Sequence, residues 1–283
     1  MGEKTSISWC DSTFNPWVGC QRVSPGCENC FAEALDKRVG GGWLDGKKSL
    51  RWGPTAPRIR TSAANWRKPL AWNRKALKAG TRPRVFCSSL ADVFEDRPEL
   101  APWRQDLFEL IAATPALDWQ ILTKRPENIL RLWPDCVPPP GAEDWPNVWP
   151  GTTVEDQQRA NERIDALVKV PAARRFLSCE PLLERVDLSR WLDEDKTGFV
   201  GLIDWVIIGG ESGPGARPFD LEWARDLVRQ CRDGGRAEAA VFVKQMGDHP
   251  VEHGKRLHLG RHGADPEQWP PDLRVQEFPE VTP

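Results

Sequence analysis

The feature that most constrains the fold is a series of six short apolar runs separated by segments of helical character. The runs are rich in Val, Ile and Phe without polar alternation, which is typical of strands covered on both faces. They begin about 25 to 35 residues apart, a spacing natural for βα units. This alternation predicts an α/β fold with a parallel sheet, as a full or partial (β/α) barrel. The runs lie at 84–90, 119–124, 147–154, 174–179, 204–210 and 240–245.

The segments between the runs predict helices. Apolar residues spaced three and four apart, as in Ile164, Leu167 and Val168, support one of them, and Gly234 with Gly235 mark the end of another. The expected helices lie at 102–115, 125–133, 155–171 and 220–235.

The domain organisation follows from the same pattern. We expect residues 1–247 to form one barrel domain that includes an N-terminal cysteine-rich loop, and residues 248–283 to form a polar, Pro-rich tail. The first residues lack a basic segment followed by an apolar run, and no stretch of 18 apolar residues occurs. The prediction is a cytoplasmic protein with no membrane partner.

Charge gives a mixed indication about partners. A formal net charge of −2 argues against a basic nucleic-acid surface over the whole protein. Two Arg- and Lys-rich segments, 38–60 and 65–84, nevertheless contain interleaved tryptophans and could bind a nucleotide or a single strand. Charge runs more often form a solvated face, and at the sequence level we favour that interpretation.

Three of the eight cysteines are clustered in the pattern Cys-x6-Cys-x2-Cys, formed by Cys20, Cys27 and Cys30. In a reducing cytoplasm such a cluster indicates metal binding rather than disulfides. Three thiolates on a loop shaped by Pro and Gly can hold three irons of a cubane and leave the fourth iron open. An open iron can bind a substrate or cofactor directly.

A zinc site is the main alternative, because Cys-x2-Cys is common in zinc sites and Cys10 could be a fourth ligand. No second Cys-x2-Cys and no nearby His completes such a site, since all four histidines lie at or beyond His249. The sequence therefore favours the iron–sulfur cluster.

Polar residues follow the predicted strands, at the end where active sites of βα barrels assemble. Each can also be an ordinary loop or capping residue. Cys87 and Cys179, by contrast, lie inside apolar runs and are expected to pack in the core. The candidates are Ser88, Ser89, Asp92, Lys124, Arg125, Glu155, Glu180, Glu211 and Lys244.

Several sequence blocks, spread over about residues 7 to 247, resemble the phage-associated three-cysteine-motif family related to radical S-adenosylmethionine enzymes. The blocks are ISWCDSTFNPWVGCQRVSPGCENCFAE, LADVFED, WQILTKRPENI, NVWPGTTVED, FLSCEPLLE, IIGGESGPGARP and VFVKQMG. The superfamily's usual spacing is Cys-x3-Cys-x2-Cys with an aromatic residue before the third cysteine, whereas here the first gap is six residues and Phe31 follows Cys30. Gly209-Gly210-Glu211 matches the superfamily's Gly-Gly-Glu segment in letters but follows a late strand.

The resemblance implies a partial barrel of the radical S-adenosylmethionine type with a [4Fe-4S] cluster on Cys20, Cys27 and Cys30. S-adenosyl-L-methionine would bind the open iron, and an external one-electron reductant would allow its cleavage to a 5′-deoxyadenosyl radical. Lys124 would neutralise the methionine carboxylate, and Ser89 or Glu180 would accept hydrogen bonds from the amino group.

The resemblance also implies a setting and a substrate. Similar phage proteins are associated with thymine hypermodification, so the first expectation is an isomerase or lyase in host cytoplasm that rearranges a glycyl-substituted thymine, in a modified nucleotide or in DNA. The alternatives are a radical repair enzyme for pyrimidine lesions and a zinc-bearing nucleic-acid-binding protein without enzymatic activity. The sequence does not identify a catalytic residue beyond the cofactor site.

Overall fold

The computed structural model divides into two compact units, which are Met1–Gly151 with Val170–Ala173 and Thr152–Lys169 with Arg174–Pro283. The boundary expected at residue 247 stays a prediction. No helix in the described parts of the chain has the length and apolar character needed to span a membrane. The structure describes residues 5–44, 46–135, 145–192, 202–233 and 239–280.

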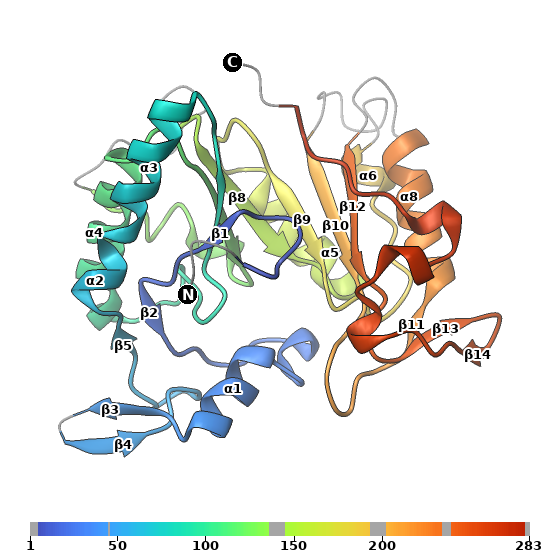
Figure 1. Cartoon of the computed structure of the whole chain (residues 1–283), viewed down its shortest axis with the longest axis horizontal. Coiled ribbons are helices and arrows are strands. Elements are labelled where there is room, and N and C mark those ends of the chain that lie inside the picture. Colours follow the sequence, from blue (N-terminus) through green and yellow to red (C-terminus); the bar gives the residue numbers. More distant parts are fainter. Residues whose placement is uncertain (1–4, 45, 136–144, 193–201, 234–238, 281–283) are drawn as a thin grey trace. The chain divides into compact units, whose positions relative to one another are not determined.

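The main sheet has the strand order β1-β6-β7-β8-β9-β10-β12. Figure 1 labels β1, β8, β9, β10 and β12 of this sheet. The pairs β1·β6, β6·β7, β9·β10 and β10·β12 are all parallel. The α/β class is confirmed, and within the described residues the order begins at β1 and ends at β12, as in a partial barrel. Its strands are β1 (Ser12–Thr13), β6 (Arg84–Cys87), β7 (Asp118–Thr123), β8 (Val148–Thr153), β9 (Phe176–Cys179), β10 (Trp205–Gly209) and β12 (Ala240–Gln245).

All six predicted strands form, but β1 was not predicted. Its two residues, Ser12 and Thr13, pair in parallel with Val85 and Phe86 of β6. A strand of two polar residues has too little hydrophobic pattern to be recognised in the sequence. Its place in the sheet depends on the long-range pairing with β6.

Three of the four predicted helices form as α4 (Ala101–Ala112), α5 (Gln157–Leu167) and α8 (Leu221–Asp233). The Asp156 side chain caps α5 by accepting a hydrogen bond from the Arg159 backbone N–H at 2.8 Å. The glycines expected to end the last helix, 234 and 235, lie outside the described residues.

The helix expected at 125–133 is wrong. Only a single 3₁₀ turn, η3 (Pro126–Asn128), forms there. Pro126 and Pro134 enclose this segment, and a proline disfavours helical geometry in the residue before it. After η3 the chain continues through turns as far as Pro134.

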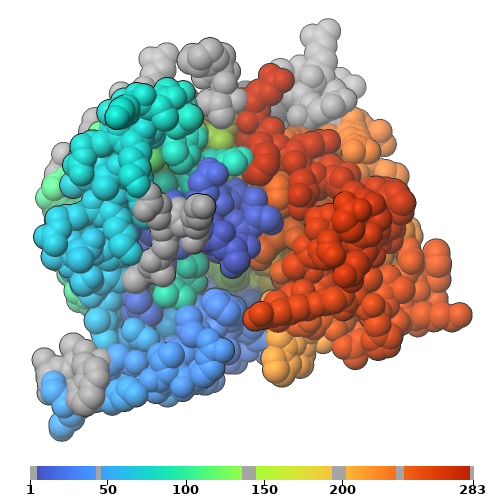
Figure 2. Space-filling model, in the orientation of Figure 1, coloured from blue at the N-terminus to red at the C-terminus, as the bar shows by residue number. Residues whose placement is uncertain are grey.

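The first unit contains further elements before β6. In Figure 2 the light blue to cyan residues of this region, which include α2 and α3, gather along one margin of the first unit. The elements are β2 (Trp17–Val18), η1 (Pro25–Cys27), α1 (Phe31–Val39), β3 (Gly42–Leu44), β4 (Lys47–Ser49), β5 (Ile59–Arg60), α2 (Ala63–Trp66) and α3 (Lys68–Ala79). η2 (Pro98–Leu100) precedes α4.

In the second unit, the C-terminal segment packs against β12. Trp269 and Leu273 are buried. The Val243 backbone N–H donates to the Val275 carbonyl at 2.8 Å, and the Glu277 N–H donates to the Val241 carbonyl at 2.8 Å. The remaining elements are α6 (Ser189–Leu192), β11 (Phe219–Asp220), β13 (Pro250–Glu252), β14 (Lys255–Arg256), η4 (Arg261–Gly263), η5 (Pro266–Gln268) and η6 (Pro271–Leu273).

A fully buried ion pair joins Arg58 to Glu95 in the first unit. The Arg58 Nε donates to Glu95 Oε2 at 2.8 Å, and Nη2 donates to Oε1 at 2.5 Å. Nη1 also donates to the Ala56 carbonyl at 2.7 Å, so the guanidinium is well satisfied. Breaking such a pair leaves an uncompensated buried charge.

We expect Arg58→Met to lower the free energy of unfolding by about 3 to 5 kcal/mol, because Glu95 would stay buried without its partner. The double variant Arg58→Met/Glu95→Leu should lose less stability than the single variant. Urea unfolding measures both, with Arg131→Ala as the control, because the Arg131–Asp96 pair is more than half exposed. An equal loss in the single and double variants would contradict the prediction.

Candidate functional site

The cysteine-rich loop of the first unit is shaped by its backbone. Gly19 has φ +122°, and a Cβ there would lie 2.6 Å from the Arg51 carbonyl oxygen, so only glycine fits. The next residue, Cys20, accepts a hydrogen bond on its carbonyl from the Gly53 N–H at 2.9 Å. The loop therefore runs alongside the segment that begins at Arg51.

The three cysteines of this loop occupy different local positions. Cys27 is the last residue of η1, and Cys30 is the N-cap residue of α1. None of the three forms a disulfide. The loop therefore carries its three free thiols on an irregular segment, a 3₁₀ turn and a helix start.

The donor set fits an iron–sulfur cluster. Three free thiols on one loop supply the donors that three irons of a cubane need, one sulfur for each iron. Within the described residues, no three His, Cys, Asp or Glu side chains are gathered around a single metal position. Cys20, Cys27 and Cys30 are the residues that would hold the cluster, and they stay a prediction as its ligands.

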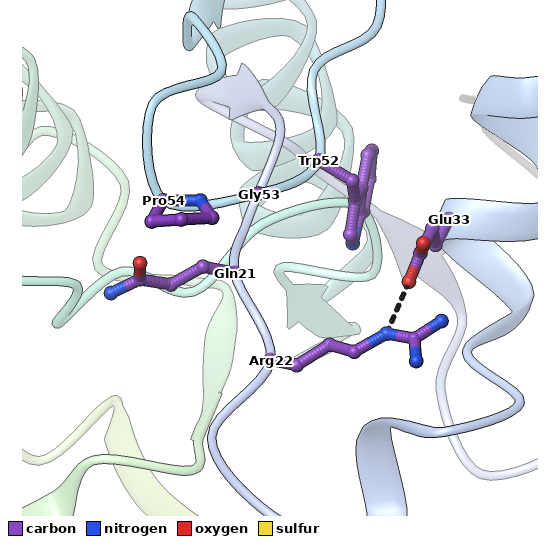
Figure 3. Close-up of a pocket in the computed structure, with 6 residues that line it drawn as sticks. All are labelled: Gln21, Arg22, Glu33, Trp52, Gly53 and Pro54. Atoms are coloured by element: carbon purple, nitrogen blue, oxygen red, sulfur yellow. Dashed lines mark hydrogen bonds and ion pairs between the residues drawn. The ribbon is translucent and has the colours of Figure 1, made fainter.

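A cavity of about 250 Å³ is lined by Gln21, the residue after Cys20, and we call it the cavity beside Cys20. Figure 3 shows the residues that line it. It is formed where the loop meets the segment that carries Trp52, which forms an isolated parallel bridge with Cys20. The Arg22 Nε donates to Glu33 Oε2 at 2.8 Å, which fixes one edge of the cavity. The lining residues are Gln21, Arg22, Glu33, Trp52, Gly53 and Pro54.

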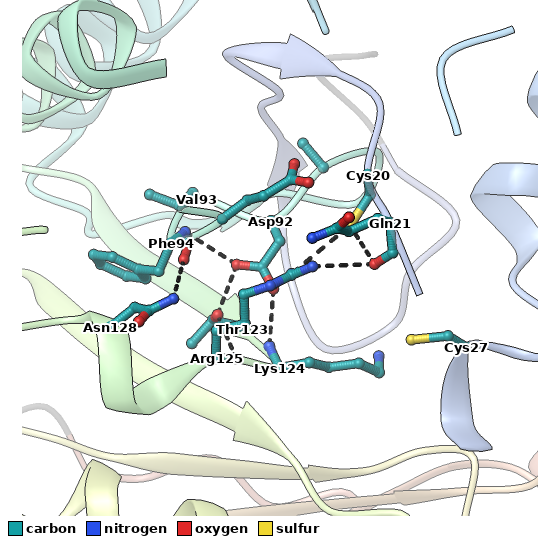
Figure 4. A network of polar contacts seen from close by, with 12 residues as sticks. Cys20, Gln21, Cys27, Asp92, Val93, Phe94, Thr123, Lys124, Arg125 and Asn128 are labelled. Atoms are coloured by element: carbon teal, nitrogen blue, oxygen red, sulfur yellow. Dashed lines mark hydrogen bonds and ion pairs between the residues drawn. The ribbon is translucent and has the colours of Figure 1, made fainter. Parts of the chain in front are cut away.

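Asp92 and Arg125, which follow β6 and β7, form a buried ion pair (Figure 4). The Arg125 Nη1 donates to Asp92 Oδ2 at 2.7 Å and lies 3.9 Å from the Cys20 sulfur. Nη2 donates to the Gln21 carbonyl at 3.1 Å. The guanidinium thus connects the strand ends to the cysteine loop.

The Asp92 carboxylate is saturated with donors. Besides Arg125, it accepts from the Thr123 hydroxyl at 2.6 Å and from the backbone N–H groups of Phe94 and Lys124 at 3.0 Å each. These donors satisfy the hydrogen-bonding capacity of the buried carboxylate and fix its position against Arg125.

The electrostatics of this network act on both Cys20 and Arg125. Burial raises the pKa of the Cys20 thiol to about 12, with a further contribution from the Asp92 charge that the Arg125 charge opposes. Burial lowers the pKa of Arg125, but the charges of Asp92 and Cys20 outweigh this effect and the pKa is raised. Arg125 is therefore a fixed cation beside Cys20, as suits an anionic ligand set.

Ser89 and Lys124 follow β6 and β7, which are neighbouring parallel strands. The Ser89 hydroxyl accepts a hydrogen bond from Asn15 Nδ2 at 3.1 Å. In Figure 4 the Lys124 side chain extends in the direction of Cys27. Of the three predicted cofactor-binding residues, these two belong to the same unit as the cysteine loop.

Glu180, the third of these residues, belongs to the second unit and follows β9. Its carboxylate accepts a hydrogen bond from the Lys244 ammonium group. A Cβ on Gly209 would lie 3.3 Å from Glu180 Cδ, so the carboxylate packs against the end of β10. Glu180 and Lys244, two of the predicted strand-end residues, are thus brought together.

The other acidic strand-end residues of the second unit form ion pairs with nearby arginines. Glu155 is fully buried and accepts from Arg163 Nη1 at 2.7 Å. Glu211 accepts from Arg217 Nη2 at 2.6 Å. These contacts stabilise local structure, and a role of the strand-end residues in an active site stays a prediction.

Close backbone packing in the second unit requires a glycine at Gly210. A Cβ on Gly210 would lie 2.4 Å from the Met246 carbonyl oxygen. The Gly210 N–H donates to the Gln245 carbonyl at 3.0 Å. The glycine allows the loop after β10 to approach the backbone after β12 closely, whatever the role of the Gly-Gly-Glu letters.

The sequence did not predict the cavity beside Cys20 or the contact between Arg125 and the cysteine loop. No sequence motif identifies the cavity-lining residues Gln21, Arg22 and Glu33 as part of a site. Arg125 was a candidate only as a strand-end residue, and it lies 105 residues from Cys20 in the chain.

The fold and this site define an α/β protein with a parallel sheet and a three-cysteine loop packed beside a buried ion pair. The chain belongs to the family described as "Protein of unknown function (DUF5131)", whose model matches residues 4–269. That description mentions neither a phage association nor a three-cysteine motif, so both stay predictions. The comparison with curated proteins found no match.

Among solved structures, the chain is similar to a mutant spore photoproduct lyase with bound AdoMet and dinucleoside spore photoproduct. The TM-score is 0.46 and the sequence identity is 10%, over 73% of this chain and 57% of that chain. A similarity of this extent does not assign an activity.

In the second unit, Asp248 holds the loop after β10. Its carboxylate accepts from the Gly213 N–H at 2.5 Å and from His262 Nδ1 at 2.8 Å. Burial raises the pKa of Asp248, but these two interactions outweigh burial and hold the pKa below its usual value. The carboxylate therefore stabilises the folded protein only while it is charged.

We expect Asp248→Asn to lower the free energy of unfolding by about 1 kcal/mol at neutral pH, because a charge-assisted hydrogen bond is lost. Since the folded-state pKa is depressed, the stabilisation is complete above the unfolded-state pKa of about 4 and is lost as pH falls through the folded-state pKa. Urea unfolding at pH values from neutral to acidic should show that the free energies of unfolding of the wild type and Asp248→Asn converge. A difference that is constant with pH would contradict this.

Proposed function

We propose that the protein is a radical S-adenosylmethionine enzyme with a [4Fe-4S] cluster on Cys20, Cys27 and Cys30. The observation that carries the proposal is the loop of three free thiols, held beside the strand ends by the Arg125 contacts to Cys20 and Gln21. When bound and reduced by one electron, the cluster would cleave S-adenosyl-L-methionine to a 5′-deoxyadenosyl radical.

The protein's own residues would hold and orient the cofactors. Arg125 would keep a cation beside the thiolate of Cys20 and fix the loop through the Gln21 carbonyl. Lys124 extends in the direction of Cys27 and would pair with the methionine carboxylate. Ser89 would accept a hydrogen bond from the amino group, with Glu180 as the alternative acceptor.

The substrate in this proposal is a modified pyrimidine nucleotide, either free or in DNA. The cavity beside Cys20 supports a site for a planar group, because it combines the Trp52 ring with the Gln21 amide and the Arg22 guanidinium. Rearrangement of a glycyl-substituted thymine is the first reaction to test, and the reductant would be an external one-electron donor.

The cluster assignment predicts which cysteines are needed. After anaerobic reconstitution, Cys20→Ala, Cys27→Ala and Cys30→Ala should each lose the [4Fe-4S] absorption and the bound iron. Cys231→Ala should keep both, because Cys231 is buried in α8 of the second unit. Iron analysis and cleavage of S-adenosyl-L-methionine on reduction measure the outcome.

The variant Cys10→Ala distinguishes an iron–sulfur cluster from a zinc site, because Cys10 would be a ligand only in the zinc site. A full iron content in all three single variants would refute the assignment. A colourless protein with one bound zinc, lost in Cys10→Ala, would support the non-enzymatic nucleic-acid-binding protein instead.

Lys124→Ala should weaken binding of S-adenosyl-L-methionine while leaving the cluster intact. Loss of one hydrogen bond to a charged group costs about 1.5 to 3 kcal/mol, which corresponds to roughly tenfold to hundredfold weaker binding. Titration of the cofactor into cluster-replete protein measures the effect, with Lys169→Ala of the second unit as control. Wild-type affinity in Lys124→Ala would remove this residue from the site.

A further inference from the structure

Positive charge is concentrated in one stretch of the first unit. From Lys37 to Arg84 the sequence contains fourteen Lys and Arg residues and one acidic residue, Asp45. The whole chain has 39 Lys and Arg against 41 Asp and Glu, so acidic residues predominate outside this stretch. Such an asymmetry within a nearly neutral chain points to a polyanionic partner.

About half of these cations stabilise the fold. Arg58 is buried with Glu95, and the others form ion pairs within the first unit. Their charges are compensated, and they contribute little to an external field. These further pairs are Lys37–Glu33, Arg51–Asp36, Arg60–Asp106, Arg82–Asp118 and Arg84–Asp11.

A second group of cations is exposed and forms no ion pair within the described residues. We call this group the basic face. It includes the end of α1, the β3–β4 hairpin, and α3 with its N-cap residue. The members of the basic face are Arg38, Lys47, Lys48, Arg67, Arg74 and Lys78.

The helical part of the basic face carries like charges on one side. Arg74 and Lys78 are four residues apart, and Arg67 lies seven residues before Arg74, so all three lie on the same side of the helix. Like charges at this spacing repel each other and destabilise a helix. An external polyanion would relieve this repulsion.

We propose that the basic face binds the phosphate backbone of a nucleic acid. The three helical cations extend over about 16 Å at 1.5 Å per residue, while a strand of B-DNA carries one charge about every 3.4 Å of helix axis. Several phosphates of one strand can therefore be contacted at once. The lysines of the hairpin add further contacts from a separate element of the same unit.

Nucleic acid is favoured over an anionic membrane for two reasons. The cations lie on a hairpin and a helix rather than on one amphipathic helix, which is the usual membrane-binding element. The same stretch also contributes Trp52 to the cavity beside Cys20, and an aromatic ring there can stack on a base. Binding at the basic face requires neither the cluster nor S-adenosyl-L-methionine. For the proposed enzyme, whose activity this step takes as given, such binding makes polymeric nucleic acid the substrate class.

The test is fluorescence anisotropy with labelled oligonucleotides of about 20 nucleotides, as duplex DNA, single-stranded DNA and RNA, between about 50 and 200 mM salt. The logarithm of the binding constant should fall linearly with the logarithm of the salt concentration. Lys47→Ala/Lys48→Ala and Arg74→Ala/Lys78→Ala should each bind about tenfold more weakly at low salt and reduce the slope by about one per cation removed.

The matched control is Lys169→Ala/Lys255→Ala, which removes two exposed lysines from the second unit and should bind like the wild type. The variants replace exposed residues, and Arg74→Ala/Lys78→Ala removes a repulsion within the helix, so the unfolding midpoints should not fall below that of the wild type. No salt-dependent binding at low salt, or an equal loss in the control, would overturn the proposal. So would tighter binding to anionic lipid vesicles than to any oligonucleotide, or equal competition by free thymidine monophosphate.

This outcome is separable from that of the proposed function. Binding is measured on the reconstituted protein and also on protein without a cluster. If the protein binds oligonucleotides but does not cleave S-adenosyl-L-methionine, the radical chemistry is refuted and the nucleic-acid interface is not. If the proteins with and without a cluster both fail to bind oligonucleotides, only the interface is refuted.

Discussion

The ion pair between Asp92 and Arg125 is the contact on which the candidate site depends. It joins the ends of two parallel strands, and the same guanidinium reaches the Cys20 sulfur and the Gln21 carbonyl. A loop with little regular structure is thereby attached to the rigid edge of a sheet. Because both charges are buried, neither can be removed without leaving the other uncompensated, which couples the position of the cysteine loop to the stability of the first unit.

The strands were predictable because each depends on a local run of apolar residues that the sheet buries on both faces. β1 was not, since Ser12 and Thr13 become a strand only through pairing with β6. The segment 125–133 forms only a 3₁₀ turn, because the prolines that enclose it disfavour helical geometry in the residues before them. The sequence thus indicated the class of fold and most of its strands, and missed elements that tertiary context determines.

The cysteines of the candidate site could be proposed from spacing alone, but their surroundings could not. The cavity beside Cys20 exists because the loop passes alongside Trp52, and no sequence pattern in either segment predicts that contact. The sequence alone favours a solvated surface for the basic stretch. Only the structure separates cations that are paired inside the first unit, such as Arg58, from those of the basic face, and this distinction changes the interpretation.

The C-terminal segment of the second unit has a protective consequence. β12 is the last strand of the described sheet order, and such an edge presents unpaired backbone groups that can recruit another chain. Phe242 forms an antiparallel bridge with Gln276, and residues on either side of it add backbone hydrogen bonds. The segment therefore occupies the place that a strand from a second molecule would take. By covering the edge of β12 it prevents edge-to-edge aggregation there.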